Sequence, residues 1–341
     1  MKNILFSSIS HISIHQVGPS DVDLMLSSEP MKVADETENH HLAQALLKGF
    51  NKDAVYQFPP DGDGGIRSIG RFVNGFSGVT GDFHEFSLEL AREWIRIKDT
   101  DSNSRELIFC HFIDLQSDQG TTTGFGIFLT DSRDKFLQVE RSSSNISLRL
   151  NEGVNLKKMT DCVLILPGLD GEPAKLFFKQ NMYDFESNIF TDRFLKAIPV
   201  HNNFYNTSSQ LNILKAFVDQ ELEESAPLDK IEKMKRTAEY FNNHDHFDHK
   251  EYGSTLFEDP DHRAAFEKFR EQYARENDIS IADEFEISPD AVKKNFRRVR
   301  SVIKLDRNFH IYVHGNRQEI VRGYDQERGK HFYKLFFDEE N

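Results

Sequence analysis

Residues 161–166 read Asp161-Cys162-Val163-Leu164-Ile165-Leu166. Apolar residues follow one another without interruption after the aspartate, whereas a strand with one side in water would alternate apolar and polar residues. An unbroken apolar run of this length is typical of a strand that is covered on both faces. We therefore expect Val163, Leu164 and Ile165 to lie in a central, buried strand of a sheet.

Segments on both sides of this run complete the sheet. Alternating or continuous apolar patterns predict strands at residues 9–17, 22–26, 107–115, 122–130, 135–141, 146–150 and 175–179. Helical spacing of apolar residues predicts helices over residues 36–50 and 82–98. Consecutive strands joined by short turns favour antiparallel pairing. Residues 1–183 are therefore expected to form an α+β domain with a mixed, mostly antiparallel sheet.

The character of the sequence changes in residues 184–287. Apolar residues recur at helical spacing in residues 190–198, 211–222, 231–241 and 264–273, and acidic residues surround them. This part is expected to form an acidic helical region. Negative charge keeps such a surface away from nucleic acid unless another group neutralises it.

A basic helix begins the C-terminal module, residues 288–341. Ser288 can cap the helix and Pro289 fits its first turn. Val292, Phe296 and Val299 share one face, and the opposite side carries Lys293, Lys294, Arg297, Arg298 and Arg300. Alternation in residues 309–313 predicts a strand, and residues 319–324 and 330–337 predict a hairpin. The last strand is so apolar that we expect it to add to a sheet or to pack against the body of the protein.

The module is basic while the rest of the chain is acidic. Residues 289–337 contain twelve Lys or Arg and five Asp or Glu, a balance of +7. Because the whole chain has a formal charge of −14 and the last four residues contribute −3, residues 1–288 carry −18. This asymmetry favours a polyanionic partner, with nucleic-acid phosphates first. The alternative is that the basic face is only solvated, or docks onto the acidic part of its own chain.

Composition describes a folded protein of 341 residues, of which 38% are hydrophobic and 29% charged. The two cysteines, Cys110 and Cys162, lie in apolar strand-like segments, so buried free thiols in a reducing compartment are expected. No apolar run is long enough to span a bilayer and the N-terminus does not resemble a signal peptide. We expect a cytoplasmic protein with no membrane partner.

Residues 244–249 read His-Asp-His-Phe-Asp-His and match the H-x-H-x-D-H spacing of metallo-β-lactamase-type hydrolases. Such a cluster can hold zinc and activate water. The preceding segment is helical, however, and the small flanking residues of that motif are absent. A simpler interpretation makes Asp248 and Glu251 a helix capping box after an apolar Phe247, with the histidines exposed in a loop. We favour this reading and expect no metal site here.

His11 and His15 offer a second, weaker metal hypothesis. Both share the parity of Ser13 and should line one polar face of the first strand, but no carboxylate or cysteine lies near them in sequence. Nucleophile elbows, Walker loops, paired C-x-x-C motifs and dinucleotide fingerprints are also missing. The sequence therefore predicts no enzymatic activity and no cofactor.

Four blocks of the chain resemble the bacterial nucleoid-associated protein family of the NdpA/YejK type. They are residues 12–17, residues 148–165, residues 190–195 and residues 297–315, the last of which is similar to the C-terminal block of a divergent branch. The resemblance implies association with the bacterial nucleoid and DNA binding without an established catalytic reaction.

These observations favour a non-catalytic nucleoid protein that binds double-stranded DNA with low sequence specificity, because phosphate contacts fix position and carry little sequence information. The expected contacts are Lys293, Lys294, Arg297, Arg298, Arg300, Lys304, Arg307 and Arg317. Two alternatives stay open: a protein-interaction module whose acidic surface binds a DNA-handling protein, and a metallohydrolase at residues 244–249. A homodimer is compatible with each of them.

Overall fold

The computed structural model describes residues 7–18, 24–33, 35–59, 66–97, 105–117, 120–142, 145–159, 161–168, 171–179, 189–220, 227–296, 301–305, 309–313 and 320–337. Contacts divide the chain into two compact units, residues 1–200 and residues 201–341. The basic helix and the acidic helices therefore belong to the same unit. Each unit is described by itself.

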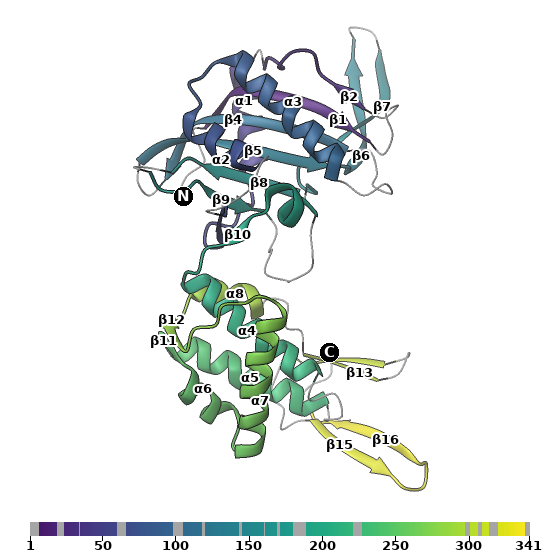
Figure 1. The fold of residues 1–341 in the computed structure, drawn as a ribbon. Coiled ribbons are helices and arrows are strands. Elements are labelled where there is room, and N and C mark those ends of the chain that lie inside the picture. Colours follow the sequence, from purple (N-terminus) through teal and green to yellow (C-terminus); the bar gives the residue numbers. More distant parts are fainter. Residues whose placement is uncertain are drawn as a thin grey trace. The chain divides into compact units, whose positions relative to one another are not determined.

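An eight-stranded antiparallel sheet organises the described part of residues 1–200, in the order β10-β3-β9-β8-β5-β4-β1-β2 (Figure 1). Its strands are β1 (Ser8–Val17), β2 (Met25–Leu26), β3 (Val55–Gln57), β4 (Arg105–Ser117), β5 (Gly120–Thr130), β8 (Asp161–Leu166), β9 (Lys175–Phe178) and β10 (Ile198–Pro199). Strand β8 lies between β9 and β5, and Val163, Leu164 and Ile165 are fully buried. The predicted central strand and the α+β class are both confirmed.

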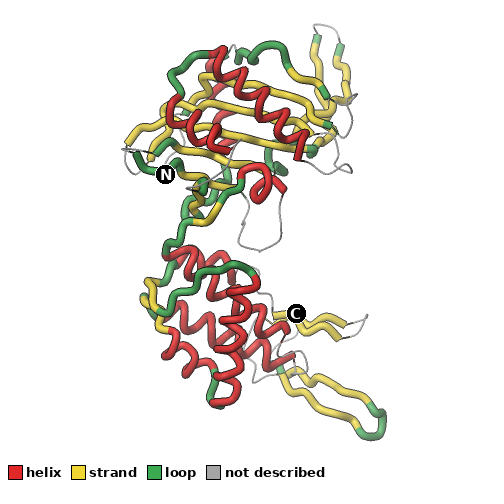
Figure 2. The backbone as a smooth tube through the Cα atoms, viewed as in Figure 1, coloured by secondary structure: helices red, strands yellow, loops and turns green. Residues whose placement is uncertain are grey.

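Helices cover both faces of this sheet, which explains why β8 is apolar from Cys162 to Leu166. Leu46 of α1 (Glu36–Leu47) packs with Ile12 and Cys110 on one face. On the other face, Phe83 of α3 (Thr80–Ile97) stacks on Phe109 with ring centroids 4.6 Å apart. Helix α2 (Ile66–Gly75) lies on this second face too, and α3 crosses the sheet in Figure 2. The cysteines Cys110 and Cys162 are buried and unbridged, as expected.

Gly126 shows how closely the core is packed. It pairs with Cys110 and with Leu164 in the middle of the sheet. A Cβ atom at this position would lie 2.4 Å from the ring of Phe128 and 2.7 Å from that of Phe112. Only glycine leaves room for the two rings, so the strand tolerates its weaker intrinsic preference for extended structure.

The hairpin of β6 (Arg133–Arg141) and β7 (Ile146–Val154) stands out from the large sheet (Figure 1). One of its faces exposes the apolar side chains Leu137, Val139, Ile146, Leu148 and Leu150. A π-helical segment, η3 (Ile189–Leu195), packs Phe194 against Trp94 of α3 before the unit ends.

Helices dominate the first part of residues 201–341, as expected from the sequence. They are α4 (Asn203–Gln220), α5 (Pro227–Asn243), α6 (His249–Leu256), α7 (Pro260–Glu276) and α8 (Pro289–Phe296). Their core is aromatic, and fully buried Phe247 stacks on Phe241 and on Phe285. Phe247 belongs to a short two-stranded sheet of β11 (His246–Asp248) and β12 (Glu284–Glu286).

Two hairpins follow α8: β13 (Ser301–Leu305) with β14 (Phe309–Val313), and β15 (Ile320–Asp325) with β16 (Lys330–Leu335). The second hairpin was predicted, but the expectation that its last strand adds to a larger sheet or packs against the body of the protein is wrong. Within the described residues β16 pairs with β15 alone, and Phe332, Phe336 and Phe337 are 44%, 49% and 70% exposed. A two-stranded ribbon has no second layer that could cover these rings.

Several elements were not predicted, namely α2, β3, β10, β11, β12 and β13. Strands β3, β10, β11 and β12 have only two or three residues, which is too few for a periodic pattern. Strand β13 has five residues and directly follows the basic stretch. Helix α2 contains Gly70 and Gly75, which lower helix propensity. No helix in the described part of the chain has the length and the apolar character needed to cross a membrane.

Candidate nucleic-acid interface

Helix α8 begins as the sequence predicts. The Ser288 hydroxyl accepts a hydrogen bond from the backbone N–H of Ala291 (3.4 Å), and Pro289 occupies the first helical position. The backbone N–H of Ser288 donates to the Thr207 hydroxyl of α4 (3.0 Å). The start of the basic helix is therefore held by a cap and by a neighbouring helix.

One side of α8 is anchored in the aromatic core. Ala291 and Val292 are buried, and Phe296 is half-buried against the same cluster. Asn295 donates from its amide to the Ala291 carbonyl (2.9 Å) and to the Ser208 hydroxyl of α4 (3.5 Å). Val299, the third residue of the predicted apolar face, lies outside the described residues.

The two described lysines of α8 differ in their surroundings. Lys293 is exposed, whereas the ammonium of Lys294 lies 5.7 Å from the ring centroid of Phe204. A cation over an aromatic face is stabilised by the ring's electrons. Lys294 is therefore packed against α4, while Lys293 faces water.

The remaining predicted contacts lie where the side chains are not described. Lys304 belongs to β13 and pairs with His310 in the backbone ladder. Five arginines fall outside the described residues: Arg297, Arg298, Arg300, Arg307 and Arg317. The structure thus places Lys293 and Lys294 together on α8.

The β15–β16 ribbon carries exposed cations that the site prediction omitted: Arg322, Arg328, Lys330 and Lys334. The ladder pairs Arg322 with Tyr333 and Tyr324 with His331, so Arg322 shares one face with two tyrosine rings, whereas Lys330 and Lys334 share the other face with Phe332. A Cβ atom on Gly323 would lie 2.3 Å from the ring of Phe332, which rests directly over this glycine on the opposite face. The balance of +7 in residues 289–337 already included these four cations, so this local excess of positive charge was the sequence signal that could have identified them.

The N-cap half of the predicted capping box is confirmed, whereas the backbone N–H of Asp248 donates to the hydroxyl of Tyr240 and not to Glu251. Asp248 caps α6, and its carboxylate accepts from the backbone N–H of Glu251 (2.8 Å). Phe247, the apolar residue before the cap, is fully buried.

The expectation that all three histidines of this segment are exposed in a loop is wrong. His249 is the first residue of α6, where its side chain is buried and bonded to Glu267 of α7. His244 stacks on Tyr240 with centroids 4.2 Å apart, and His246 is exposed. The three imidazoles therefore have three different environments. No group of three or more His, Cys, Asp or Glu that could hold a metal occurs among the residues the structure describes.

The histidines of β1 do share one face with Ser13, but α3 buries that face. Ser13 bonds to His84 of α3 (3.0 Å) and His15 to Ser87 (2.9 Å). Burial, followed by the neighbouring charge of His84, lowers the pKa of His15 to about 4. The polar side of the strand is thus a buried hydrogen-bonded layer.

His111 of β4 belongs to the same polar layer and bonds to the hydroxyl of Ser10 (2.6 Å). Burial, followed by the proximity of His11, lowers the pKa of His111 to about 4. Ser10 and the histidines satisfy one another, so the layer needs no metal to explain it.

No curated protein matches the chain significantly. The family model described as nucleoid-associated protein YejK matches residues 13–330, which span both compact units. The match confirms the resemblance noted in the sequence and with it the expected association with the bacterial nucleoid. Since the matched region covers far more than half of the 341 residues, the chain belongs to the family of the nucleoid-associated protein YejK.

Proposed function

We propose that the chain is a non-catalytic nucleoid protein that binds double-stranded DNA with low sequence specificity through its basic C-terminal module. The observation that carries the proposal is the family membership combined with the separation of charge inside one compact unit. Residues 201–288 contain twenty acidic and ten basic residues, whereas residues 289–337 carry a balance of +7. Duplex DNA would meet repulsion from the acidic helices and attraction from the module.

The anchoring of α8 supports a role for its basic side. Its apolar residues are used in packing on the core, so Lys293 projects into water from a helix whose position is fixed. In this proposal Lys293, Lys294, Arg297, Arg298, Arg300, Lys304, Arg307 and Arg317 contact phosphates.

The β15–β16 ribbon adds a second basic surface to the proposed interface. A two-stranded ribbon has a width that the major groove of DNA can accept. Its cations alternate with tyrosine and phenylalanine side chains, and aromatic rings in such positions can contact sugars and bases. Arg322, Arg328, Lys330 and Lys334 therefore join the proposed contacts.

Salt-dependent binding of two unrelated duplexes to the purified full chain tests this proposal. Low specificity requires similar affinities for both duplexes, and each phosphate contact contributes about one unit to the slope of log affinity against log salt. Lys250 and Lys268 lie exposed on α6 and α7, outside the module, so Lys250→Glu/Lys268→Glu is a matched control for charge reversal. A wild-type protein that fails to bind either duplex at low salt would refute the proposal.

The acidic helices favour a second candidate function, in which they bind a basic surface of a DNA-handling protein. The twofold excess of acidic over basic residues in residues 201–288 is the observation behind it. The two functions predict opposite mutational patterns. Charge reversal in the module would spare the second function, whereas neutralising exposed acids such as Glu258 and Asp261 would abolish it and would leave DNA binding intact or stronger.

A further inference from the structure

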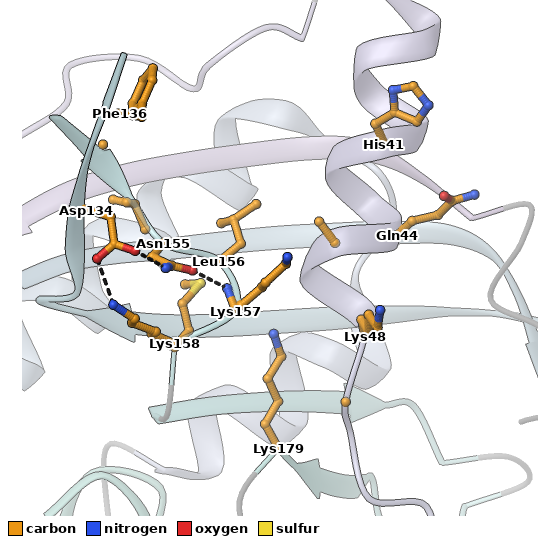
Figure 3. A pocket seen from close by; sticks show the side chains of 15 residues that line it. His41, Gln44, Lys48, Asp134, Phe136, Asn155, Leu156, Lys157, Lys158 and Lys179 are labelled. Atoms are coloured by element: carbon orange, nitrogen blue, oxygen red, sulfur yellow. Dashed lines mark hydrogen bonds and ion pairs between the residues drawn. The ribbon is translucent and has the colours of Figure 1, made fainter. Parts of the chain in front are cut away.

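A cavity in the described part of residues 1–200 lies between the end of α1, the base of the β6–β7 hairpin and the residue that follows β9 (Figure 3). Its volume is about 1030 Å³, which falls at the large end of the range for small-molecule sites. Four lysines line it, namely Lys48, Lys157, Lys158 and Lys179, and we call this cavity the lysine pocket. Asp134 is the one acidic residue in its lining.

Asp134 neutralises only one of these lysines. Its carboxylate forms an ion pair with Lys158 (2.8 Å) and accepts a hydrogen bond from the amide of Asn155. The Asn155 side chain in turn accepts from the backbone N–H of Lys157 (2.9 Å), which fixes the loop after β7. Lys48, Lys157 and Lys179 therefore supply positive charge that no acid of the lining balances.

The arrangement of the three remaining ammonium groups favours an anion. Figure 3 shows Lys48 at the end of α1, Lys157 from the loop after β7 and Lys179 after β9 reaching toward the same space. Gly49, with φ of +95°, adopts the left-handed conformation that lets the chain leave α1 directly behind Lys48. Cations from three separate elements thus converge on one cavity.

Lys179 differs from Lys48 and Lys157 because it is half-buried. Its ammonium lies 5.4 Å from the ring centroids of both Phe50 and Phe128. Burial lowers the pKa of Lys179, since no carboxylate offsets its loss of hydration. A half-buried cation without a counter-ion in a cavity is typical of a binding site rather than of a structural ion pair.

The opposite wall of the lysine pocket is apolar. Phe136 is 52% exposed, and Val154 and Leu156 line the pocket with it. An exposed aromatic ring beside aliphatic groups offers a surface for a flat base. A bare phosphate would use the lysines alone and leave this wall and most of the volume empty.

We propose that the lysine pocket binds a nucleotide that carries a 5′-phosphate group. The phosphates bind to Lys48, Lys157 and Lys179, and the base lies against Phe136 and Leu156. The ligand is either a free nucleotide or the 5′-phosphorylated end of a DNA strand, since both present the same chemistry. This site lies in a different unit from the basic module and does not depend on it.

Calorimetric titration of the full chain with ATP tests the proposal, with tripolyphosphate and adenosine as partial ligands. ATP is expected to bind more tightly than either, because only ATP uses both walls. Lys48→Glu and Lys179→Gln are each expected to weaken ATP binding about tenfold or more, the usual value of a lost charge-assisted hydrogen bond. Lys175→Glu is the matched control, because Lys175 is exposed on β9 and outside the lining.

The results of these titrations distinguish the proposed nucleotide site from its alternatives. Tripolyphosphate that binds as tightly as ATP, equal loss of affinity in Lys175→Glu, or no ATP binding by folded protein would each overturn the proposal. If Lys179→Gln fails to fold, as the fluorescence of the single tryptophan Trp94 in the same unit reports, the exposed Lys48 still decides the result. Competition by a 5′-phosphorylated oligonucleotide, but not by its 5′-hydroxyl form, identifies a strand end, whereas competition by neither identifies a free nucleotide. Arg297→Glu/Arg298→Glu is expected to bind ATP like wild type even if DNA binding is lost.

Discussion

Ser13 and His15 of β1 are polar, yet both are buried beneath α3 and bonded to side chains of that helix. Sequence alternation identified their common face, but alternation cannot tell water from a polar layer inside the protein. His84 and Ser87 are three residues apart on α3, so they lie one turn apart and meet the strand at neighbouring positions. Whether the polar positions of β1 meet the polar positions of α3 depends on how the two elements pack, and the sequence pattern of either element alone does not show it.

The buried histidines make residues 1–200 sensitive to acid. His15 and His111 have pKa values lowered from 6.5 to about 4 by burial, so the unfolded chain binds more protons than the folded chain between these pH values. Stability is therefore complete above the unfolded pKa and is lost as pH falls toward 4, by up to about 1.4 kcal/mol per pH unit for each histidine. Urea unfolding followed by Trp94 fluorescence at several pH values measures this loss.

The substitution His15→Gln distinguishes the contribution of His15 to acid sensitivity from the contributions of other titratable groups. His15→Gln is expected to remove the contribution of one histidine to the pH dependence of the free energy of unfolding. Stability then falls less steeply toward pH 4, even if the substitution lowers stability at neutral pH. His41→Gln removes an exposed histidine of the same unit and is expected to change nothing. An unchanged slope in His15→Gln would show that His15 does not remain neutral in the folded protein.

Asp248 offers a local test of the helix start. Asp248→Ala removes the acceptor for the N–H of Glu251 and is expected to cost about 1 kcal/mol, the usual value of a lost N-cap. Asp248→Asn keeps an acceptor and is expected to cost much less. Helical circular dichroism during urea unfolding measures both. Equal losses in the two variants would contradict the capping role.

Phe247 and Phe296 differ in burial, and their truncations should differ accordingly. Phe247 is fully buried between two rings, so Phe247→Ala is expected to cost about 3 to 5 kcal/mol. Phe296 is only half-buried at the end of α8, so Phe296→Ala is expected to cost less than Phe247→Ala. Chemical unfolding followed by helical circular dichroism compares them. A larger loss at Phe296 would mean that α8 is a more central part of the core than its exposure indicates.

At the scale of elements, α8 and the β15–β16 ribbon are expected to contribute separately to DNA binding. Lys330→Glu/Lys334→Glu reverses two exposed charges on the ribbon and leaves α8 unchanged. Binding should weaken equally for unrelated duplexes, and the salt slope should become shallower by about one unit for each phosphate contact that is lost. Anisotropy titrations at several salt concentrations measure both quantities. An unaltered slope would remove the ribbon from the interface.

Elements with long periodic patterns were predictable and short ones were not. The eighteen residues of α3 repeat their apolar positions over several turns, and β8 is apolar from Cys162 to Leu166, so both were predicted from sequence. Strand β11 has three residues and exists because it pairs with β12, which lies far along the chain. His249, which follows this strand, begins α6 and is buried against the prediction. The cations of the lysine pocket come from three distant segments and have no common motif.

At the scale of the whole molecule, the two units differ in their architecture and in the binding sites we expect them to carry. Residues 1–200 enclose a large sheet between helices and contain the lysine pocket, whereas residues 201–341 combine acidic helices with the basic module. Because Trp94 is the single tryptophan and lies in the first unit, its fluorescence reports on that unit alone. Charge reversals in the module are therefore expected to leave the tryptophan transition unchanged. A shift of that transition would reveal coupling between the units.

The most direct test of the central claim is the salt dependence of duplex DNA binding by Arg297→Glu/Arg298→Glu. The helical pattern of the sequence predicts that both arginines lie away from Val292 and Phe296. Exposed substitutions usually change stability by no more than about 0.5 kcal/mol, so the variant is expected to stay folded. If the module binds DNA, affinity falls for every duplex and the slope becomes shallower by about one unit per lost contact, while Lys250→Glu/Lys268→Glu binds like wild type. Equal affinities of the folded arginine variant and wild type at low salt would contradict the account and assign the basic face another purpose.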